Sequence, residues 1–161
     1  MKEQEMIIQE LNRLVQVCRD GFDGFRKAAL EVENEDYQAL FRTTAGQRAN
    51  FVVRLQDEVR KRGSRPPARG SLTGMLHRAW MNFRHQINPH QDRIVLMECR
   101  RGEEHALKAY EDVFENKRLA DLQPVLESQF VSMIEMRNLL RESTIGRNDK
   151  DNLPSLFHLE T

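Results

Sequence analysis

The sequence predicts an all-α protein, a four-helix bundle of two antiparallel hairpins joined by a long crossover that carries a short extra helix. Apolar residues recur every three or four positions through four long segments, which is the spacing of one helix face. At 161 residues and 39% hydrophobic content, the chain has the size of one domain with one core. We expect the bundle over residues 1–144, its crossover over residues 63–89, and a C-terminal tail over residues 145–161.

The first hairpin is expected to pair a helix from about Glu3 to Val32 with a helix from about Glu35 to Arg62. The turn between them is so short that the two helices must be antiparallel, and Asn34 in this turn can cap the second helix. Gly21 and Gly24 interrupt the first helix at a cost of roughly 1 kcal/mol each relative to Ala. Close approach of another helix would compensate for that cost.

The stretch from Gly63 to Asn88 is much longer than a turn between bundle neighbours needs. Ser71 stands at the N-cap position of a short amphipathic helix. The apolar face of that helix consists of Leu72, Met75, Leu76, Ala79, Trp80, Phe83 and Ile87. This length indicates a crossover that travels along the bundle, and we expect Trp80 to anchor it there.

The second hairpin is expected to pair a helix that begins at Asn88-Pro89 and ends near Asn116 with a helix that stops before Gly146. The inner stripe of this last helix is expected to be Leu122, Leu126, Phe130, Met133, Met136 and Leu140. The tail that follows carries a second apolar group, Leu153, Leu156, Phe157 and Leu159. We expect these residues to dock on the chain's own surface, with docking on a partner as the alternative.

Charge and cysteine content limit the classes of function. The chain has 25 basic and 25 acidic residues, so no overall field favours nucleic acid or a membrane surface. The N-terminus has no continuous apolar segment, and the two cysteines without a secretory context indicate a reducing compartment. We therefore expect a cytoplasmic protein. The basic region from Arg54 to Arg84 is interpreted as solvated charge, with an anionic partner as the alternative.

A weak repeat relates the two hairpins. The segment CRDG at Cys18 matches CRRG at Cys99, and Lys27-Ala28 matches Lys108-Ala109 at the same offset. We interpret these identities as traces of duplicated helix pairs. Two hairpins joined by one long crossover is the connectivity of ferritin-like bundles.

Three stretches carry a resemblance to a known family: CRDGFDGF from residue 18, GSLTGMLHRAWM from residue 70 and ECRRGEE from residue 98. Together they are similar to an uncharacterised bacterial family of ferritin-like four-helix-bundle proteins, classified as a domain of unknown function. The resemblance covers about Leu11 to Leu140. It implies the ferritin-like fold and brings no established reaction.

The chemistry that such bundles host is a di-iron or di-manganese centre held by inward-pointing Glu and Glu-x-x-His ligands. This chain contains no Glu-x-x-His, and its weak candidate ligands are Glu98, Glu103 and His105. Arg48 lies on the inner face of the second helix beside Thr44, where it would repel a metal pair but can pair with Glu103 or Glu98. We expect no cofactor and a metal-free core with paired polar groups.

Cys18 and Cys99 both lie on inner stripes, and the repeat would relate them by a pseudo-two-fold axis. Buried cysteine usually acts as a small core hydrophobe, which is the role we expect. The alternative is a redox-responsive pair, which requires a Cα separation of roughly 4.4–6.8 Å.

No phosphate-binding loop or nucleophile elbow is present, so the sequence nominates no catalytic or cofactor-binding residue. We expect a non-enzymatic ferritin-like structural or interaction protein, stress-related, that forms a homodimer and has an unknown protein partner. The alternative is a metal-binding oxidoreductase or storage protein of the di-iron or di-manganese type with a degenerate ligand set.

Overall fold

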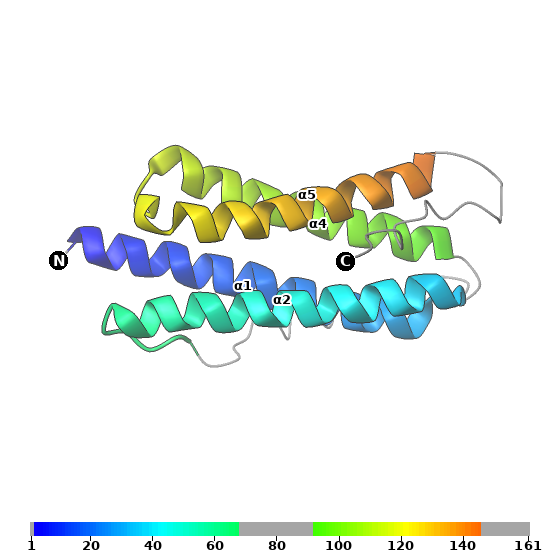
Figure 1. Cartoon of the computed structure of the whole chain (residues 1–161), viewed down its shortest axis with the longest axis horizontal. Helices are drawn as coiled ribbons and strands as arrows, with labels where there is room; N and C mark the ends of the chain where they lie inside the picture. The colour runs from blue at the N-terminus through cyan, green and yellow to red at the C-terminus, as the bar shows by residue number, and fades with distance from the viewer. Residues whose placement is uncertain (1, 68–91, 146–161) are drawn as a thin grey trace, which may run out of the picture.

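The computed structural model describes residues 2–67 and 92–145, and all regular structure in these residues is helical (Figure 1). The elements are α1 (Lys2–Glu31), α2 (Glu35–Lys61), α4 (Asp92–Asn116), the 3-10 turn η1 (Ala120–Leu122) and α5 (Gln123–Ile145). The all-α prediction is confirmed for the described residues, and the helix limits agree with the predicted ones within one or two residues where both are described. The crossover helix with Trp80, the Asn88-Pro89 start and the apolar part of the tail lie outside the described residues.

The turn between α1 and α2 is held by two side chains. Asn34 Oδ1 accepts hydrogen bonds from the backbone N–H groups of Asp36 at 2.9 Å and Tyr37 at 3.1 Å, which confirms the predicted cap. Asp92, the first residue of α4, accepts from the backbone N–H groups of Glu33 at 2.9 Å and Asn34 at 3.0 Å. The start of α4 is therefore fixed beside this turn.

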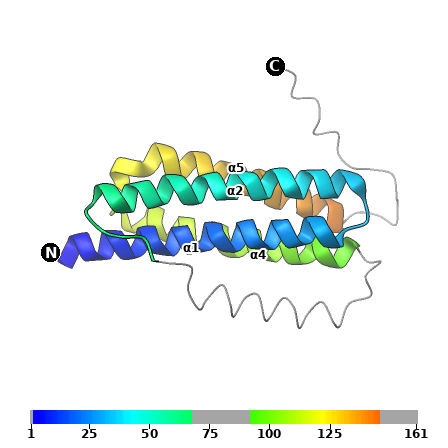
Figure 2. The ribbon, with the colours of Figure 1, turned by 90° about the horizontal axis from the view of Figure 1, so that it is seen from below.

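The end of α2 lies at the opposite end of the bundle. The carbonyl of Arg62 accepts from Gln4 Nε2 at 3.0 Å, near the beginning of α1. The Arg62 guanidinium also pairs with Asp121 in η1 at 2.6 Å. The end of α2 and the start of α4 thus lie at opposite ends of the bundle (Figures 1 and 2). The predicted crossover over residues 63–89 lies mostly outside the described residues.

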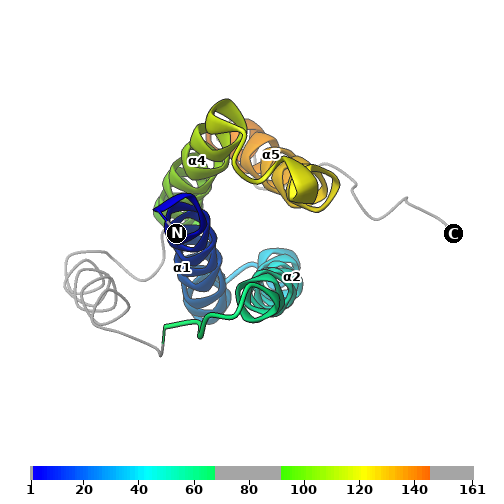
Figure 3. The ribbon, with the colours of Figure 1, turned by 90° about the vertical axis from the view of Figure 1, so that its left-hand side faces the viewer.

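The four helices form two antiparallel hairpins, α1 with α2 and α4 with α5. Between the hairpins, α1 packs against α4, so these two helices form the central pair (Figure 3). None of the described helices has a stretch apolar enough to cross a lipid bilayer.

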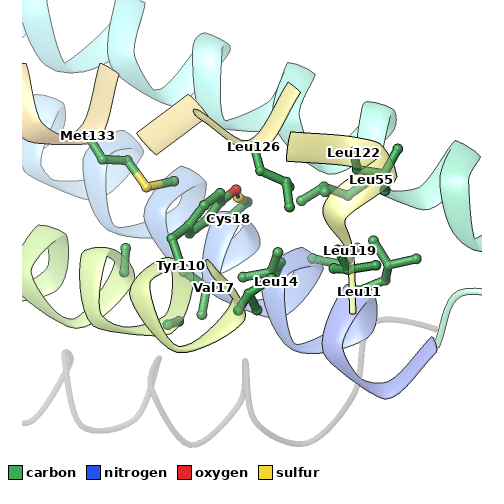
Figure 4. Packing of buried hydrophobic residues seen from close by; sticks show 14 of the residues in the cluster. Leu11, Leu14, Val17, Cys18, Leu55, Tyr110, Leu119, Leu122, Leu126 and Met133 are labelled. Carbon is green, nitrogen blue, oxygen red and sulfur yellow. Dashed lines mark hydrogen bonds between the residues drawn. The ribbon is translucent and has the colours of Figure 1, made fainter. Parts of the chain in front are cut away.

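The core consists of two hydrophobic clusters placed along the bundle. The first contains Leu11, Leu14, Leu55, Tyr110, Leu126 and Met133, among others (Figure 4). The second contains Phe25, Phe41, Val95, Cys99, Met136 and Leu140, among others. Phe51 packs against the first cluster and Phe25 belongs to the second. A charged side chain, Arg48, lies over the rings of both, and it marks the boundary between the clusters.

Candidate functional site

A buried ion pair joins the two hairpins at this boundary. Arg48 of α2 and Glu103 of α4 are 1% and 2% exposed, and Arg48 Nη2 donates to Glu103 Oε2 at 2.8 Å. Arg48 Nη1 donates to Gln47 Oε1 at 2.5 Å. The guanidinium carbon lies 5.8 Å from the ring centroid of Phe25 and 5.3 Å from that of Phe51, within the range of cation–π attraction. The predicted pairing of Arg48 with Glu103 is confirmed.

The Arg48 side chain packs against Gly21 of α1. A Cβ at Gly21 would lie 3.4 Å from both Cγ and Cδ of Arg48, at the short end of ordinary van der Waals contact. At Gly24 an added Cβ would meet no atom within 4 Å. At Gly21 the approach that would compensate for the glycine comes from the Arg48 side chain of α2, and at Gly24 no atom of the described residues comes as close.

The electrostatics of the pair follow from its burial. Burial raises the pKa of Glu103, while the charge and hydrogen bond of Arg48 act to lower it. Arg48 Nε is also buried and has no hydrogen-bond partner among the described residues. Removal of either charged partner would leave the other as an uncompensated buried charge, which is strongly unfavourable.

Two hydrogen bonds link Cys18, Tyr110 and Gln129 in the buried core, and Figure 4 shows Cys18 next to Tyr110. Tyr110 Oη donates to Gln129 Oε1 at 2.7 Å, and Cys18 Sγ lies 3.3 Å from Tyr110 Oη. Because the only hydroxyl proton of Tyr110 goes to Gln129, the thiol of Cys18 is the donor to Oη. Burial raises the pKa of Cys18 to about 12 and raises that of Tyr110 well above its ordinary value. Neither group supplies an anion near neutral pH.

Cys99 lies in the second cluster, so the two cysteines belong to different parts of the core. Burial is the main cause that raises the pKa of Cys99, and the charges of Glu103 and Glu98 add to it. Both cysteines are free thiols. These properties suit core hydrophobes, and the redox pairing of Cys18 with Cys99 stays a prediction.

The three candidate metal ligands occupy different surroundings. Glu103 faces Arg48, Glu98 pairs with Arg101 at 2.9 Å on the outside of α4, and His105 is exposed. Within residues 2–67 and 92–145, no three His, Cys, Asp or Glu side chains gather as a group that could hold a metal ion. The donor set therefore fits a bound metal poorly, because its most buried member is already matched by a cation.

A groove of about 440 Å³ lies between α1 and α4, directly beside the ion pair. Its walls include Gly21, Gly24 and Gly102, and its mainly apolar floor includes Val17, Phe25, Cys99, Ala106 and Met133. Its polar lining comes from Arg48, Glu103, Asp20, Asp23, Lys27, Glu98, Arg101 and His105. The equivalent glycines of the repeat, Gly21 and Gly102, thus line one groove.

Two acidic side chains of α1, Asp20 and Asp23, line this groove. Burial raises the pKa of Asp20, the nearby charge of Asp23 adds to this rise, and hydrogen bonding to Gln16 and the charge of His105 oppose it. Gln16 Nε2 donates to Asp20 Oδ1 at 2.8 Å. At about 100° per residue, Asp20 lies opposite the inner stripe of α1, so helical periodicity alone does not predict the partial burial of its carboxyl.

The described part of the basic region is largely neutralised by its own acids. Glu58 is buried and accepts from Arg54 at 2.6 Å, Lys61 at 3.1 Å and Arg62 at 2.9 Å. Arg60 pairs with Asp57 at 2.9 Å. The basic side chains in these pairs are compensated by acids of the same helix, and the interpretation of the region as solvated charge and the alternative of an anionic partner both stay predictions.

With this geometry established, residues 6–116 match the family described as Domain of unknown function (DUF2383). The chain belongs to the DUF2383 family. This match confirms the predicted resemblance to an uncharacterised family. Searches of curated proteins and of solved structures found no match.

The DUF2383 match ends where α4 ends, at residue 116. It therefore contains the whole ion pair and every residue that lines the groove from α1, α2 and α4. Gln129 of α5 lies beyond the match, as does Met133 on the groove floor. The central helix pair and its polar contact are thus features of the DUF2383 part of the chain.

Proposed function

We propose that this DUF2383 protein is a non-enzymatic scaffold with ferritin-like topology, a structural or interaction protein in which an ion pair takes the place of a metal centre. The observation that carries this proposal is the buried pair of Arg48 and Glu103 between the two core clusters. In ferritin-like bundles, carboxylates and imidazoles from facing helices project into the core to bind metal. In this chain a guanidinium from α2 projects into the core between the facing helices.

The topology supports the ferritin-like part of the proposal. The chain forms two antiparallel hairpins, and α2 ends at the opposite end of the bundle from the start of α4, which is compatible with the connectivity of ferritin-like folds. The bacterial, cytoplasmic, stress-related and homodimeric aspects belong to the same proposal. Sedimentation velocity at several protein concentrations tests the dimer.

Charge supports the metal-free part. A divalent cation beside Glu103 would lie next to a permanently protonated guanidinium, and it would have to compete with a 2.8 Å charge-assisted hydrogen bond. The alternative function is a metal-binding oxidoreductase or storage protein with Glu98, Glu103 and His105 as a degenerate ligand set. All three residues line the same groove. This alternative therefore predicts that the protein retains metal and that replacing Glu103 removes it.

Elemental analysis separates the two functions. The protein is loaded anaerobically with iron(II) or manganese(II), desalted and compared with its Glu103→Gln and Glu104→Gln variants. Glu104 is the matched control, because it is the exposed neighbour that pairs with Arg100 at the surface. We expect none of the three proteins to retain metal above the buffer blank. Near-stoichiometric metal in the wild type and in Glu104→Gln, lost in Glu103→Gln, would overturn the proposal.

A further inference from the structure

We propose that the groove between α1 and α4 binds a small aromatic amine, whose ring lies in the groove and whose ammonium group pairs with Asp20 and Asp23. Three properties of the groove support this assignment: its size and apolar lining, its charge, and a buried donor on its wall that has no acceptor. Ligand binding at this site is additional to the scaffold function proposed above and does not depend on the absence of a metal.

The size and lining of the groove suit a small molecule. Its volume of about 440 Å³ lies within the usual range of ligand-binding pockets, which is roughly 300–1,000 Å³. Its floor is mainly apolar, and Gly21, Gly24 and Gly102 leave parts of the α1 and α4 walls without side chains. At Gly24 and Gly102 an added Cβ would meet no atom of the described residues within 4 Å. A flat apolar group, such as an aromatic ring, can approach bare backbone of this kind closely.

The charge of the groove selects the sign of the ligand. Its described lining has four acids, Asp20, Asp23, Glu98 and Glu103, and three Lys or Arg side chains, Lys27, Arg48 and Arg101. Two of the acids are already matched in ion pairs, Glu103 by Arg48 and Glu98 by Arg101. With His105 neutral, the described lining carries one negative charge in excess. A ligand with one positive charge complements it.

Asp20 and Asp23 are the acids that meet the ammonium group. They lie three residues apart on α1, so they are neighbours on the surface of the helix. Burial raises the pKa of Asp20, and the negative charge of Asp23 raises it further. The hydrogen bond that Asp20 Oδ1 accepts from Gln16 at 2.8 Å comes from a neutral amide. A cation beside the two carboxylates relieves their repulsion.

The wall of the groove also contains a buried donor without an acceptor. The Arg48 side chain is 1% exposed, and its Nε has no hydrogen-bond partner among the described residues. This nitrogen is 3.8 Å from the position of an added Cβ at Gly21, so it lies at a glycine of the groove wall. The guanidinium already lies over the rings of Phe25 and Phe51. An aromatic ring beside Gly21 gives the Nε–H group a π face, the same kind of partner.

A series of probes that share an indole ring tests the ligand class. Tryptamine carries an ammonium group at neutral pH, tryptophol carries a hydroxyl at the same place, and indole-3-propionate carries a carboxylate. By isothermal titration calorimetry of the full-length protein at pH 7, we expect a one-to-one complex with tryptamine. Tryptophol should bind at least about ten-fold more weakly, and indole-3-propionate should not bind. No saturable binding of tryptamine, or equal affinities for the amine and the alcohol, would overturn the proposal.

Nuclear magnetic resonance locates the bound probe. In amide spectra of the isotope-labelled protein, we expect tryptamine to shift the signals of Gly21, Gly24 and Gly102, which line the groove. Gly46 is the internal control, because it is exposed on α2 and does not line the groove. Saturable binding that leaves the three groove glycines unshifted would place the ligand elsewhere and contradict the proposal.

A charge variant tests the ammonium site. Asp20→Asn keeps an oxygen that can accept from Gln16 but removes the negative charge. It should therefore weaken tryptamine binding at least about five-fold and leave tryptophol binding unchanged. Asp57→Asn is the matched control, because Asp57 is half exposed on α2 and does not line the groove. An Asp20→Asn protein that binds tryptamine as tightly as the wild type would show that this carboxylate does not meet the ammonium group.

A groove-filling variant tests the ring site. Gly24→Leu places a side chain in the groove and should abolish binding of both tryptamine and tryptophol, whereas Gly46→Leu on α2 should bind them as the wild type does. Circular dichroism establishes that each variant is folded. If Gly24→Leu does not fold, Gly24→Ala replaces it, with a smaller loss of affinity expected. Unchanged binding in the folded groove variant would refute the location.

Discussion

At the residue scale, the Arg48 guanidinium meets a carboxylate, an amide and two aromatic rings at the same place. Each contact supplies something that water would otherwise supply to the cation. The carboxylate balances the charge, the amide oxygen accepts an N–H, and the rings present their negative faces. The aliphatic part of the Arg48 side chain packs against Gly21.

The pair should therefore behave as a unit in unfolding experiments. We expect Glu103→Ala to lower the free energy of unfolding by about 3–5 kcal/mol, because it leaves Arg48 charged and buried. The double variant Arg48→Met with Glu103→Leu should recover most of that loss, since it replaces both charges by apolar groups of similar size. Urea denaturation measures both values. Additive losses in the double variant would show that the two side chains are not coupled.

The two thiols should be slow to react in the folded protein. The pKa of Cys18 rises from 9.0 to about 12, so at neutral pH its thiolate fraction is reduced about 1000-fold. We expect native-state reaction with a thiol reagent to be at least about 100-fold slower than in urea, with two thiols titrated after unfolding. A changed mobility on non-reducing gels after oxidant, with both free thiols lost, would instead support the redox pair.

At the element scale, the last turns of α2 are held by Glu58, and this predicts a pH dependence. Burial alone would raise the pKa of Glu58, but hydrogen bonds from Lys61 and Arg62 and the charge of Arg54 outweigh it and lower the pKa. Since the folded-state pKa lies below the ordinary 4.5, the stabilisation is present above pH 4.5 and is lost as pH falls below it.

We expect Glu58→Gln to destabilise the protein by about 1–3 kcal/mol at pH 7, because charged hydrogen bonds are lost. The difference from the wild type should shrink as pH falls below 4.5. Thermal unfolding across pH 3–7 measures this. Asp57→Asn is the control, since Asp57 and Arg60 are half exposed and their pair contributes little. A Glu58→Gln effect that is the same at all pH values would rule out the carboxylate as its cause.

The limits of the helices and the Asn34 cap could be predicted from sequence because they depend on local features: capping residues, glycine, proline and the three-to-four spacing. The pairing of Arg48 with Glu103 could be predicted because both lie near inner faces. Gln129 was missed since the spacing from Leu126 to Met133 allows either Gln129 or Phe130 inside, and the apolar residue was preferred. In the structure Gln129 is buried and Phe130 is only partly so.

The groove could not be predicted, because it depends on two helices that are distant in sequence. Gly24 and Gly102 are unremarkable helix positions until α1 and α4 lie side by side. The partial burial of Asp20 also depends on the contact between these two helices. Periodicity identifies the most apolar stripe of a helix, whereas a central helix such as α1 has two neighbours and needs two contact faces.

At the scale of the whole molecule, the hairpins meet through α1 and α4, and the end of α2 and the start of α4 lie at opposite ends of the bundle. The sequence predicts that Trp80 anchors the crossover to the bundle, and this residue lies outside the described ranges. We expect Trp80→Ala to lower the free energy of unfolding by about 3–5 kcal/mol. Trp80→Phe, which keeps a ring, should cost less. An unchanged melting temperature for Trp80→Ala would refute the anchoring role.

The central claim is that an ion pair, and not a metal site, occupies the middle of the bundle. The most direct measurement is the free energy of unfolding in urea, under anaerobic conditions, with and without manganese(II), for the wild type and Glu103→Gln. A ligand at 100 times its Kd stabilises the folded state by about 2.7 kcal/mol. We predict no manganese-dependent change in either protein. A rise of that size in the wild type that is absent in Glu103→Gln would contradict the account.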